Sequence, residues 1–246
     1  MLTALFADIH ANREAFSACL AHVAALDAKQ YVFLGDYVGY GADPGWTLDT
    51  VMTYVAAGAL AVLGNHDAAV FDATADLNDS ARAAIAWTRG QLNERQRNFL
   101  RGLPLTVERG DRLFVHASAW QPAHWDYVTG PATALRSFNA TQHRTTFCGH
   151  VHVPELYHLS ANAKVGTFAP VPGAAIPLGP QRRWLAVLGS VGQPRDGVPA
   201  ASCALLDEKH NVLTFLRVPY DARTAAEKVR TAGLPEVLSL RLLNGR

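Results

Sequence analysis

The chain has 246 residues, enough to bury one sizeable core, and we expect residues 1–246 to form a single domain. Its 22 basic and 21 acidic residues nearly balance, and no basic stripe typical of nucleic-acid or membrane-surface binding is visible. Three widely spaced cysteines predict buried thiols, and neither a signal peptide nor an apolar run of roughly 20 residues is visible, so we expect a soluble, cytoplasmic protein.

The first third of the chain alternates strand and helix patterns. Buried strands are predicted at Leu2–Ala7, Tyr31–Leu34 and Ala59–Leu63. Between them, Asn12 caps a predicted helix over Arg13–Leu26, and Pro44 begins a helix that runs to about Ala57. This βαβαβ order predicts parallel strands joined by helical crossovers.

The rest of the chain begins with two short helices and then becomes strand-rich. The helices are predicted at Ser80–Gly90 and Asn93–Arg101, each capped by its first residue, with Gly90 as a terminator. Strands follow at Leu105–Glu108, Leu113–His116, Arg144–Cys148, Glu155–Leu159, Trp184–Leu188, Ser202–Leu206 and Val212–Val218. Ser160–Arg183 predicts an irregular excursion, and late helices are predicted at Tyr220–Thr231 and Pro235–Leu243. We expect these strands to form a second sheet against the first, flanked by helices, in an α/β fold.

Five short polar segments follow the strand-like runs. They are Asp8-Ile9-His10, Gly35-Asp36, Gly64-Asn65-His66-Asp67, His116 and Gly149-His150-Val151-His152. Each lies where a strand is predicted to end, which is the edge of an α/β sheet where ligands bind. Carboxylates, imidazoles and one carboxamide that converge there are the composition that a pair of catalytic divalent metal ions requires.

The spacing within these segments supports a metal site. The predicted ligands are Asp8, His10, Asp36, Asn65, His116, His150 and His152. Asp8 and His10 are two residues apart, so both side chains can point the same way, and the last two histidines repeat this geometry. Asp36 is placed to bridge two ions through its two oxygens. Nitrogen and oxygen ligands without thiolate favour Mn²⁺, Fe, Co²⁺ or Zn²⁺ over Ca²⁺ or Mg²⁺, and we favour Mn²⁺.

His66 is the histidine of these segments that we do not assign as a ligand. We expect it to donate a proton to the leaving-group oxygen, with Asp67 orienting and charging its ring. Any one segment is weak evidence, because an Asp after a strand is commonly a cap and a lone His is commonly structural. The assignment of a metal site rests on all five segments occurring together and in this order. The other histidines are interpreted as surface or structural groups: His22, His124, His143, His158 and His210.

Arg195 and the nearby aromatic residues each have two interpretations. Arg195 either contacts a substrate phosphate or pins a Gly/Pro turn through Asp196, and the structural role is favoured. Several aromatic side chains either line a pocket for a nucleobase or pack within their loops, with packing favoured: Tyr37, Tyr40, Trp120, Trp125 and Tyr127.

In this order, the motifs Asp8-x-His10, Gly35-Asp36, Gly64-Asn65-His66-Asp67, His116 and Gly149-His150-x-His152 resemble those of the calcineurin-like metallophosphoesterases. The resemblance implies a four-layer αββα sandwich of two mixed sheets, with a dinuclear metal site at the C-terminal ends of strands. It implies a first metal ion held by Asp8, His10, Asp36 and His152. It implies a second held by Asp36, Asn65, His116 and His150. His66 would be the family's catalytic histidine.

A later segment extends the resemblance to about Leu2–Asp207. Gly189-Ser190-Val191-Gly192-Gln193-Pro194-Arg195 is similar to a segment of small prokaryotic members, in a branch that includes hydrolases of dinucleoside polyphosphates. Ala11 departs from the pattern, since many relatives have Gly in Asp-x-His-Gly-Asn, and this bears on the turn before Asn12. The two-arginine pattern of the protein serine/threonine phosphatases is absent.

We therefore expect a dinuclear metal-dependent phosphoesterase that hydrolyses phosphodiester or phosphoanhydride bonds, with a metal-bridging hydroxide as nucleophile. Its expected partner is a small phosphorylated substrate, a nucleotide for preference, and not a membrane or a nucleic acid. The alternatives are a phosphomonoesterase or protein serine/threonine phosphatase, and a scaffold that binds metal without catalysis. The intact ligand set and His66 argue against the scaffold. The physiological substrate, native metal and oligomeric state stay open.

Overall fold

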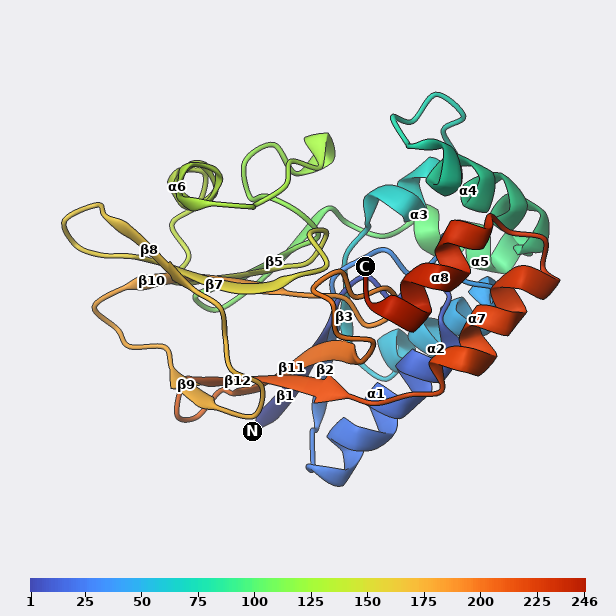
Figure 1. Cartoon of the computed structure of the whole chain (residues 1–246). Helices are drawn as coiled ribbons and strands as arrows, with labels where there is room; N and C mark the ends of the chain where they lie inside the picture. Colours follow the sequence, from blue (N-terminus) through green and yellow to red (C-terminus); the bar gives the residue numbers. More distant parts are fainter.

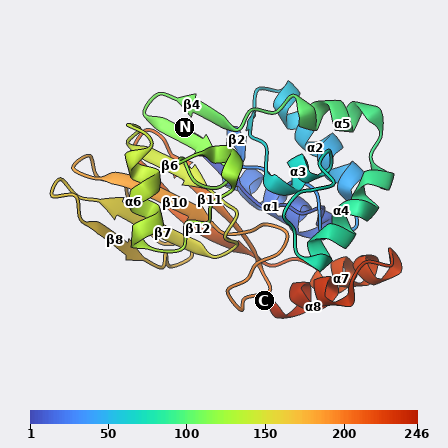
Figure 2. The ribbon, with the colours of Figure 1, turned by 90° about the horizontal axis from the view of Figure 1, so that it is seen from above.

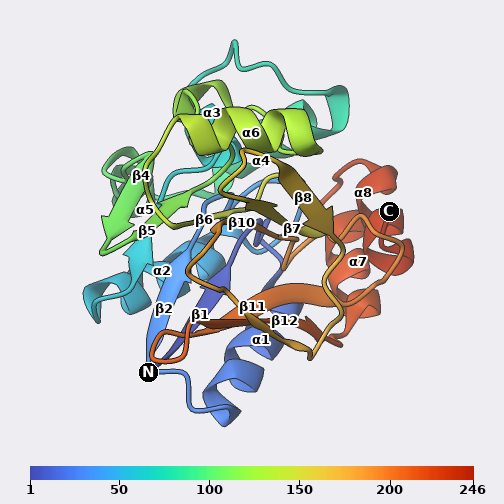
Figure 3. The same ribbon diagram turned by 90° about the vertical axis from the view of Figure 1, so that its left-hand side faces the viewer.

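Two six-stranded mixed sheets pack face to face in the computed structural model, which describes residues 1–246. Helix α6 (Pro131–Asn139) covers the outer face of one sheet, and α1 (Arg13–Ala25) covers the outer face of the other (Figure 1). The end-on view shows the same four layers from top to bottom (Figure 3). The predicted αββα sandwich is confirmed.

The strands of each sheet come from both halves of the chain. Across the first sheet the order is β3 (Leu60–Ala61), β2 (Gln30–Phe33), β1 (Leu2–Phe6), β11 (Ala201–Asp207), β12 (Val212–Val218) and β9 (Ala175–Pro177). Across the second it is β4 (Thr106–Arg109), β5 (Arg112–Val115), β6 (Thr145–Cys148), β10 (Arg183–Leu188), β7 (Pro154–Leu159) and β8 (Val165–Phe168).

Most of the remaining helices gather beyond one end of the sheets (Figure 2). They are α2 (Pro44–Ala56), α3 (Asn65–Ala69), α4 (Asp79–Gln91), α5 (Glu94–Arg101), α7 (Ala222–Thr231) and α8 (Glu236–Asn244), and a short 3₁₀ turn, η1, spans Pro122–His124. No helix combines the length and the apolar character needed to cross a lipid bilayer.

Parallel pairing brings the candidate segments to one edge. Strands β1, β2 and β3 pair in parallel, as the βαβαβ pattern predicts, and β5, β6 and β10 do the same in the second sheet. Antiparallel pairing of β11 with β1 and of β12 with β11 extends the first sheet. Because parallel strands end on the same side, the loops after β1, β2, β3, β5 and β6 meet there.

Successive side chains of β1 point to opposite faces of the first sheet, so this strand contacts both neighbouring layers. Leu5 packs between the two sheets, against residues such as Phe147, whereas Phe6 packs outward under α1. The Phe6 ring lies 5.8 Å from that of Phe16 and 5.5 Å from that of Phe33, measured between centroids. Each fully buried aromatic side chain of this kind contributes about 1.5–3 kcal/mol.

The structure differs from the predicted elements in three places. Within Ser160–Arg183, expected to be irregular, β8 and β9 form edge strands that pair through their backbones and carry no apolar alternation. Helices α3 and α6 were not predicted. Helix α4 starts from Asn78, whose Oδ1 accepts from the N–H of Ala81, and it runs through Gly90 because the cap and the buried face outweigh one glycine.

The two C-terminal helices pack on each other, with α7 against α1, and share a hydrophobic cluster with Tyr40 of the loop after β2. Lys228 of α7 donates to Oε1 of Glu14 at 2.5 Å and to Oδ2 of Asp43 at 2.8 Å. Burial opposes the lysine charge, but these two carboxylates outweigh it and raise the pKa of Lys228. The contact ties the C-terminal helices to the starts of α1 and α2.

Candidate metal centre

The five segments predicted from the sequence converge on one buried cluster. Asp8 and His10 follow β1, Asp36 follows β2, Asn65 begins α3 after β3, His116 follows β5, and His150 and His152 follow β6. Three groups within this cluster have ligand atoms that lie within 4.8 Å of one another, which is close enough to hold a metal ion. The predicted clustering at the strand ends is confirmed.

The first group contains Asp8, His10 and His152. Nε2 of His10 lies 3.0 Å from Nε2 of His152, and Nε2 of His152 lies 3.5 Å from Oδ1 of Asp8. All three side chains are buried. Two ring nitrogens and a carboxylate oxygen thus face one small volume.

The second group contains Asp36, His116 and His150. Nε2 of His116 lies 3.4 Å from Oδ2 of Asp36 and 3.2 Å from Nδ1 of His150. Oδ1 of Asn65 lies 3.0 Å from the same Nε2. The carboxamide therefore faces this group, as the sequence analysis expects.

Asp36 lies between the two groups. Its Oδ2 is 3.4 Å from Nε2 of His116 and 3.7 Å from Nε2 of His10. Its Oδ1 instead accepts from the backbone N–H of His66 at 2.8 Å. One oxygen of Asp36 thus faces both groups, because the other satisfies the first turn of α3, and the sharing of two ions by this carboxylate stays a prediction.

Three of the imidazoles are oriented by backbone carbonyls. Nδ1 of His116 lies 2.7 Å from the carbonyl of Leu34, and Nδ1 of His152 lies 2.7 Å from that of Gln193. Nδ1 of His10 lies 3.1 Å from the carbonyl of Val38. A carbonyl only accepts, so Nδ1 carries a proton in all three rings. In neutral His10 and His152, Nε2 therefore presents a lone pair to the cluster, and Nε2 of His116 does so once this ring loses its second proton. Facing lone pairs beside carboxylates require a cation between them, so these residues fit a divalent metal.

Burial keeps most of these imidazoles neutral. It lowers the pKa of His10 and of His152 well below the usual range, and it lowers that of His150 to about 3, with the charge of His116 as the next cause. Neutral imidazole is the form that binds a metal ion.

Asp36 and His116 behave as an ion pair. Burial disfavours both charges, but their contact outweighs it, raising the pKa of His116 to about 9 and holding that of Asp36 well below its usual range. Burial, together with the nearby charge of Asp36, raises the pKa of Asp8 to about 8. The buried carboxylates thus lack full charge compensation from the protein alone.

His66 lies beside the first group, within the third set of ligand atoms together with His10 and Asp36. Its ring centroid is 4.9 Å from that of His10 and 4.5 Å from that of Tyr40, and burial lowers its pKa. The buried Nδ1 has no hydrogen-bond partner. A Cβ on Gly39 would lie 2.4 Å from this nitrogen, so glycine is needed there.

Asp67 does not contact the ring of His66, in contrast to the expectation. Its two oxygens accept from the backbone N–H groups of Asp36 at 2.8 Å, Tyr37 at 2.9 Å, Val38 at 3.2 Å and Gly64 at 3.1 Å. These donors would otherwise be buried without a partner. Asp67 therefore fixes the loop that carries Asp36, and a catalytic assignment is replaced by a positioning one.

Left-handed backbone is concentrated in the same loops. Positive φ angles occur at Asp8 (55°), His10 (49°), Ala11 (51°), Asp36 (56°) and His150 (68°). Each such conformation costs a non-glycine residue about 1–3 kcal/mol and persists only where the surroundings impose it. Ala11 is one of these strained residues, yet its N–H still donates to the carbonyl of Tyr37 at 2.8 Å. The turn is therefore intact.

The Gly189–Arg195 segment supports the first group from behind. Oγ of Ser190 donates to the carbonyl of Asp8 at 2.8 Å, and Nδ2 of Asn12 donates to that of Gly192 at 2.8 Å. A Cβ on Gly192 would lie 1.9 Å from the carbonyl oxygen of Ile9, so no other residue fits. The segment thus holds the loop after β1 in place.

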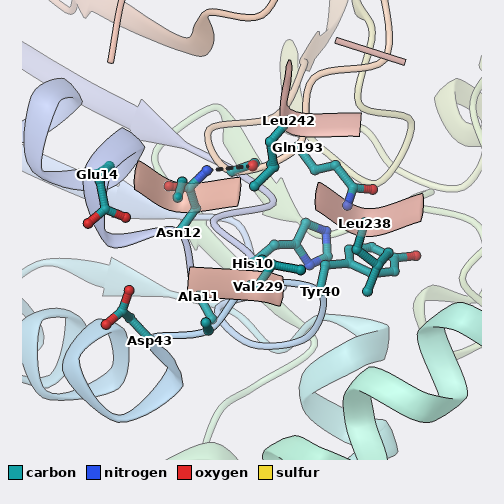
Figure 4. A pocket seen from close by; sticks show the side chains of 14 residues that line it. His10, Ala11, Asn12, Glu14, Tyr40, Asp43, Gln193, Val229, Leu238 and Leu242 are labelled. Carbon is teal, nitrogen blue, oxygen red and sulfur yellow. Dashed lines mark hydrogen bonds between the residues drawn. The ribbon is translucent and has the colours of Figure 1, made fainter. Parts of the chain in front are cut away.

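Figure 4 shows the void enclosed between this segment and the C-terminal helices. His10, Tyr40 and Gln193 line one part of it, and Leu238 and Leu242 of α8 line another. Its volume of about 10 Å³ suits a single water molecule. The C-terminal helices therefore back the first group and leave no room for a larger ligand.

Arg195 reaches the site and does not pin its own turn. Its Nη2 lies 3.2 Å from Oε1 of Gln193 and 3.4 Å from the hydroxyl oxygen of Tyr40, and its buried Nε has no partner. Asp196 pairs with Arg217 instead, so the favoured structural interpretation through Asp196 is wrong.

The aromatic residues divide between packing and the site. Tyr37 is fully buried and its hydroxyl donates to the carbonyl of Val62 at 2.7 Å, so packing is confirmed for it. Tyr40 contacts the rings of His10 and His66 instead. Tyr127 stacks on His150 with centroids 4.0 Å apart. Tyr40, Tyr127 and Gln193 are site residues whose role the sequence did not indicate. The available signal for Gln193 was its place in the Gly189–Arg195 segment, between Gly192 and Pro194.

Comparison with known proteins agrees with this geometry. The calcineurin-like phosphoesterase superfamily domain matches residues 1–211. The chain is 34% identical to an uncharacterised protein of Methanocaldococcus jannaschii, over 100% of this chain and 98% of the relative. A metallophosphoesterase from Sphaerobacter thermophilus is 34% identical with a TM-score of 0.89, covering 100% of this chain and 99% of that one. A hypothetical protein from Pyrococcus horikoshii, 19% identical with a TM-score of 0.78 over 100% and 98% of the chains, shares the fold. With its ligand set at the strand ends and its whole length aligned to such relatives, the chain belongs to the calcineurin-like phosphoesterase superfamily.

Proposed function

We propose that this phosphoesterase hydrolyses phosphodiester or phosphoanhydride bonds of nucleotides with two divalent metal ions, of which Mn²⁺ is favoured. The observation that supports this most is Asp36, whose Oδ2 lies within 3.7 Å of an imidazole nitrogen from each of the two groups. One carboxylate oxygen between two sets of nitrogen and oxygen donors suits two metal ions that share a bridging ligand.

Each residue of the centre takes a separate role in this proposal. Asp8, His10 and His152 hold one ion, Asn65, His116 and His150 hold the other, and Asp36 is shared. When bound, the two ions would activate water and neutralise phosphate charge. His66 would donate a proton to the leaving oxygen, since it is the buried histidine without a hydrogen-bond partner at Nδ1 and without an assigned ion.

Asp67 positions the Asp36 loop in this scheme and does not touch the substrate. We further propose that residues 1–246 form one domain, because β11 and β12 near the C-terminus complete the sheet that β1 begins.

Arg195 would hold a phosphate oxygen of the substrate. Its guanidinium lies at the site with one buried N–H free, and a planar guanidinium can donate two parallel hydrogen bonds to a phosphate. Arg195→Lys keeps the charge but loses the paired donors, so we expect KM to rise about tenfold with kcat changed less. Steady-state kinetics check this, and an unchanged KM would remove Arg195 from the substrate site.

A metal-reconstituted substrate screen tests the proposed function. Turnover of a phosphodiester, a dinucleoside polyphosphate and a phosphomonoester is measured with added Mn²⁺ and with chelator, and with His66→Ala as the catalytic control. We expect metal-dependent turnover of the first or second substrate class. Equal activity with and without metal contradicts the proposal, and a clear preference for the monoester assigns the protein to the phosphomonoesterases instead.

A further inference from the structure

A groove of about 520 Å³ opens beside the second group of the metal centre. Asn65 and His150 belong both to this group and to the lining of the groove. The rest of the lining comes from two segments: α3 with the loop that follows it, and the loop from His124 to Tyr127. A volume of this size accommodates a small organic ligand, so a substituent of a phosphate at the metal centre can extend into the groove.

Two aromatic side chains line the groove next to the predicted ligands. Tyr127 stacks on the ring of His150, with an interplanar angle of 21°, and remains 50% exposed. Trp125 meets the ring of His116 edge-on, with centroids 5.8 Å apart. The backbone of Trp125 is left-handed, with φ of 58°, so the loop holds this residue in a conformation that its sequence disfavours. Such rings offer flat apolar faces to a planar ligand.

The charge of the groove is negative. No lysine or arginine lines it, whereas Asp72, Asp76 and Asp126 do. Asp126 is compensated by Arg136, whose Nη1 lies 3.5 Å away. Asp72 accepts only from Thr74, and the guanidinium of Arg89 faces the backbone carbonyl of Asp72, not its carboxylate. Neither Asp72 nor Asp76 forms an ion pair, and only the charge of nearby Arg89 acts on Asp72. The lining therefore stays net negative, which disfavours any ligand that brings further negative charge.

We propose that this groove binds a nucleoside-like substituent of the substrate phosphate, planar and without negative charge, and that it selects against substituents that carry further phosphates. The inference rests on the proposed function and narrows it to phosphodiesters with one phosphate. Arg195 is the cation of the site. It contacts Tyr40 and Gln193, which lie outside the groove, and its charge also acts on the hydroxyl of Tyr127, where the groove meets the metal centre. The reacting phosphate thus meets positive charge at the centre, and its substituent meets aromatic faces and carboxylates.

Binding of a nucleoside tests whether the aromatic side chains of the groove hold a base, and it does not depend on turnover. The dissociation constant of adenosine is measured by calorimetry on the metal-loaded protein and on Trp125→Ala. Base stacking on one aromatic side chain predicts a loss of about tenfold in affinity. Trp46→Ala is the matched control, because Trp46 is a partly buried tryptophan of α2 that packs against Phe16 and does not line the groove. Affinity that stays within about twofold in Trp125→Ala overturns the proposal.

Substrate preference tests whether the carboxylates of the groove select against substrates with further phosphates. We measure kcat/KM for a dinucleoside monophosphate and for a dinucleoside tetraphosphate and divide the first value by the second. This ratio is compared between the wild type and the double variant Asp72→Asn/Asp76→Asn. We expect the double variant to lower this ratio about threefold or more, and the distant, exposed pair Asp27→Asn/Asp111→Asn to leave it unchanged. An unmoved ratio in the groove variant overturns the proposal. If the wild type hydrolyses no phosphoester, the proposed function fails, while adenosine binding still decides whether the groove takes a nucleoside.

Discussion

The two halves of the metal centre share their chemistry but not their surroundings. Asp8, His10 and His152 are enclosed, with 0%, 1% and 2% of their surface exposed, and the Gly189–Arg195 segment and the C-terminal helices lie behind them. Asn65 and His150 line an open groove. The comparison shows that similar ligand sets can have different surroundings: the first group is closed off from solvent, whereas two residues beside the second ion position also line a groove.

Asp36 joins the two halves, so its replacement has the largest expected effect. Asp36→Asn removes the charge that both groups share, and we expect kcat on a phosphodiester to fall about 1,000-fold or more, with the bound metal dropping from two ions per chain towards one. Kinetics and elemental analysis on the same sample measure both quantities. Asp111→Asn is the control at an exposed site. Full activity in Asp36→Asn would separate catalysis from this centre.

His66 belongs to the enclosed side but is proposed to act on the substrate. His66→Ala removes the proposed proton donor, and we expect kcat to fall about 100- to 1,000-fold while both ions stay bound. Metal content is the decisive readout, because His66 also lies within ligand distance of His10 and Asp36. Loss of an ion in this variant would make His66 a ligand.

Asp67 tests how far the enclosed side depends on backbone contacts. Asp67→Asn replaces one acceptor oxygen with a donor facing backbone N–H groups, and we expect the free energy of unfolding to fall by about 2–3 kcal/mol. Urea denaturation of the metal-free protein measures this. A stability equal to that of the wild type would mean that the loop does not need its four hydrogen bonds.

Ala11 gives the smallest expected change and has the opposite sign. Its φ of 51° suits glycine, so Ala11→Gly relieves backbone strain, partly offset by the greater freedom of the unfolded chain. We expect a gain of about 0.5–1 kcal/mol and a rise in Tm of about 1–4 °C. A lower Tm would show that the methyl group of this buried residue packs too well to lose.

The sequence predicts the residues of the metal centre better than the contacts between the loops that carry them, for a physical reason. Asp8, Asp36 and His116 lie within three residues of the ends of β1, β2 and β5, whose buried apolar pattern is strong, so the place where each strand ends is readable. The role of Asp67 depends on which backbone N–H groups a neighbouring loop leaves unpaired, and Tyr127 reaches His150 through a left-handed turn. No local pattern encodes such contacts between loops.

The same reason explains the elements that the sequence did not indicate. Strands β8 and β9 pair at the edges of the sheets with side chains partly or fully exposed, so hydrogen bonds and not an apolar face define them. Helix α6 begins with Pro131 and buries Ala134 and Phe138, a signal that is present but short.

The number and position of bound metal ions decide whether the centre is dinuclear. Anomalous diffraction from crystals of the Mn²⁺-loaded protein would place each ion relative to the two groups. We predict two ions, one on each side of Asp36 Oδ2: the first beside His10 and His152, and the second beside His116 and His150. A single ion, or ions bound away from Asp36, would contradict a dinuclear centre that is shared through Asp36.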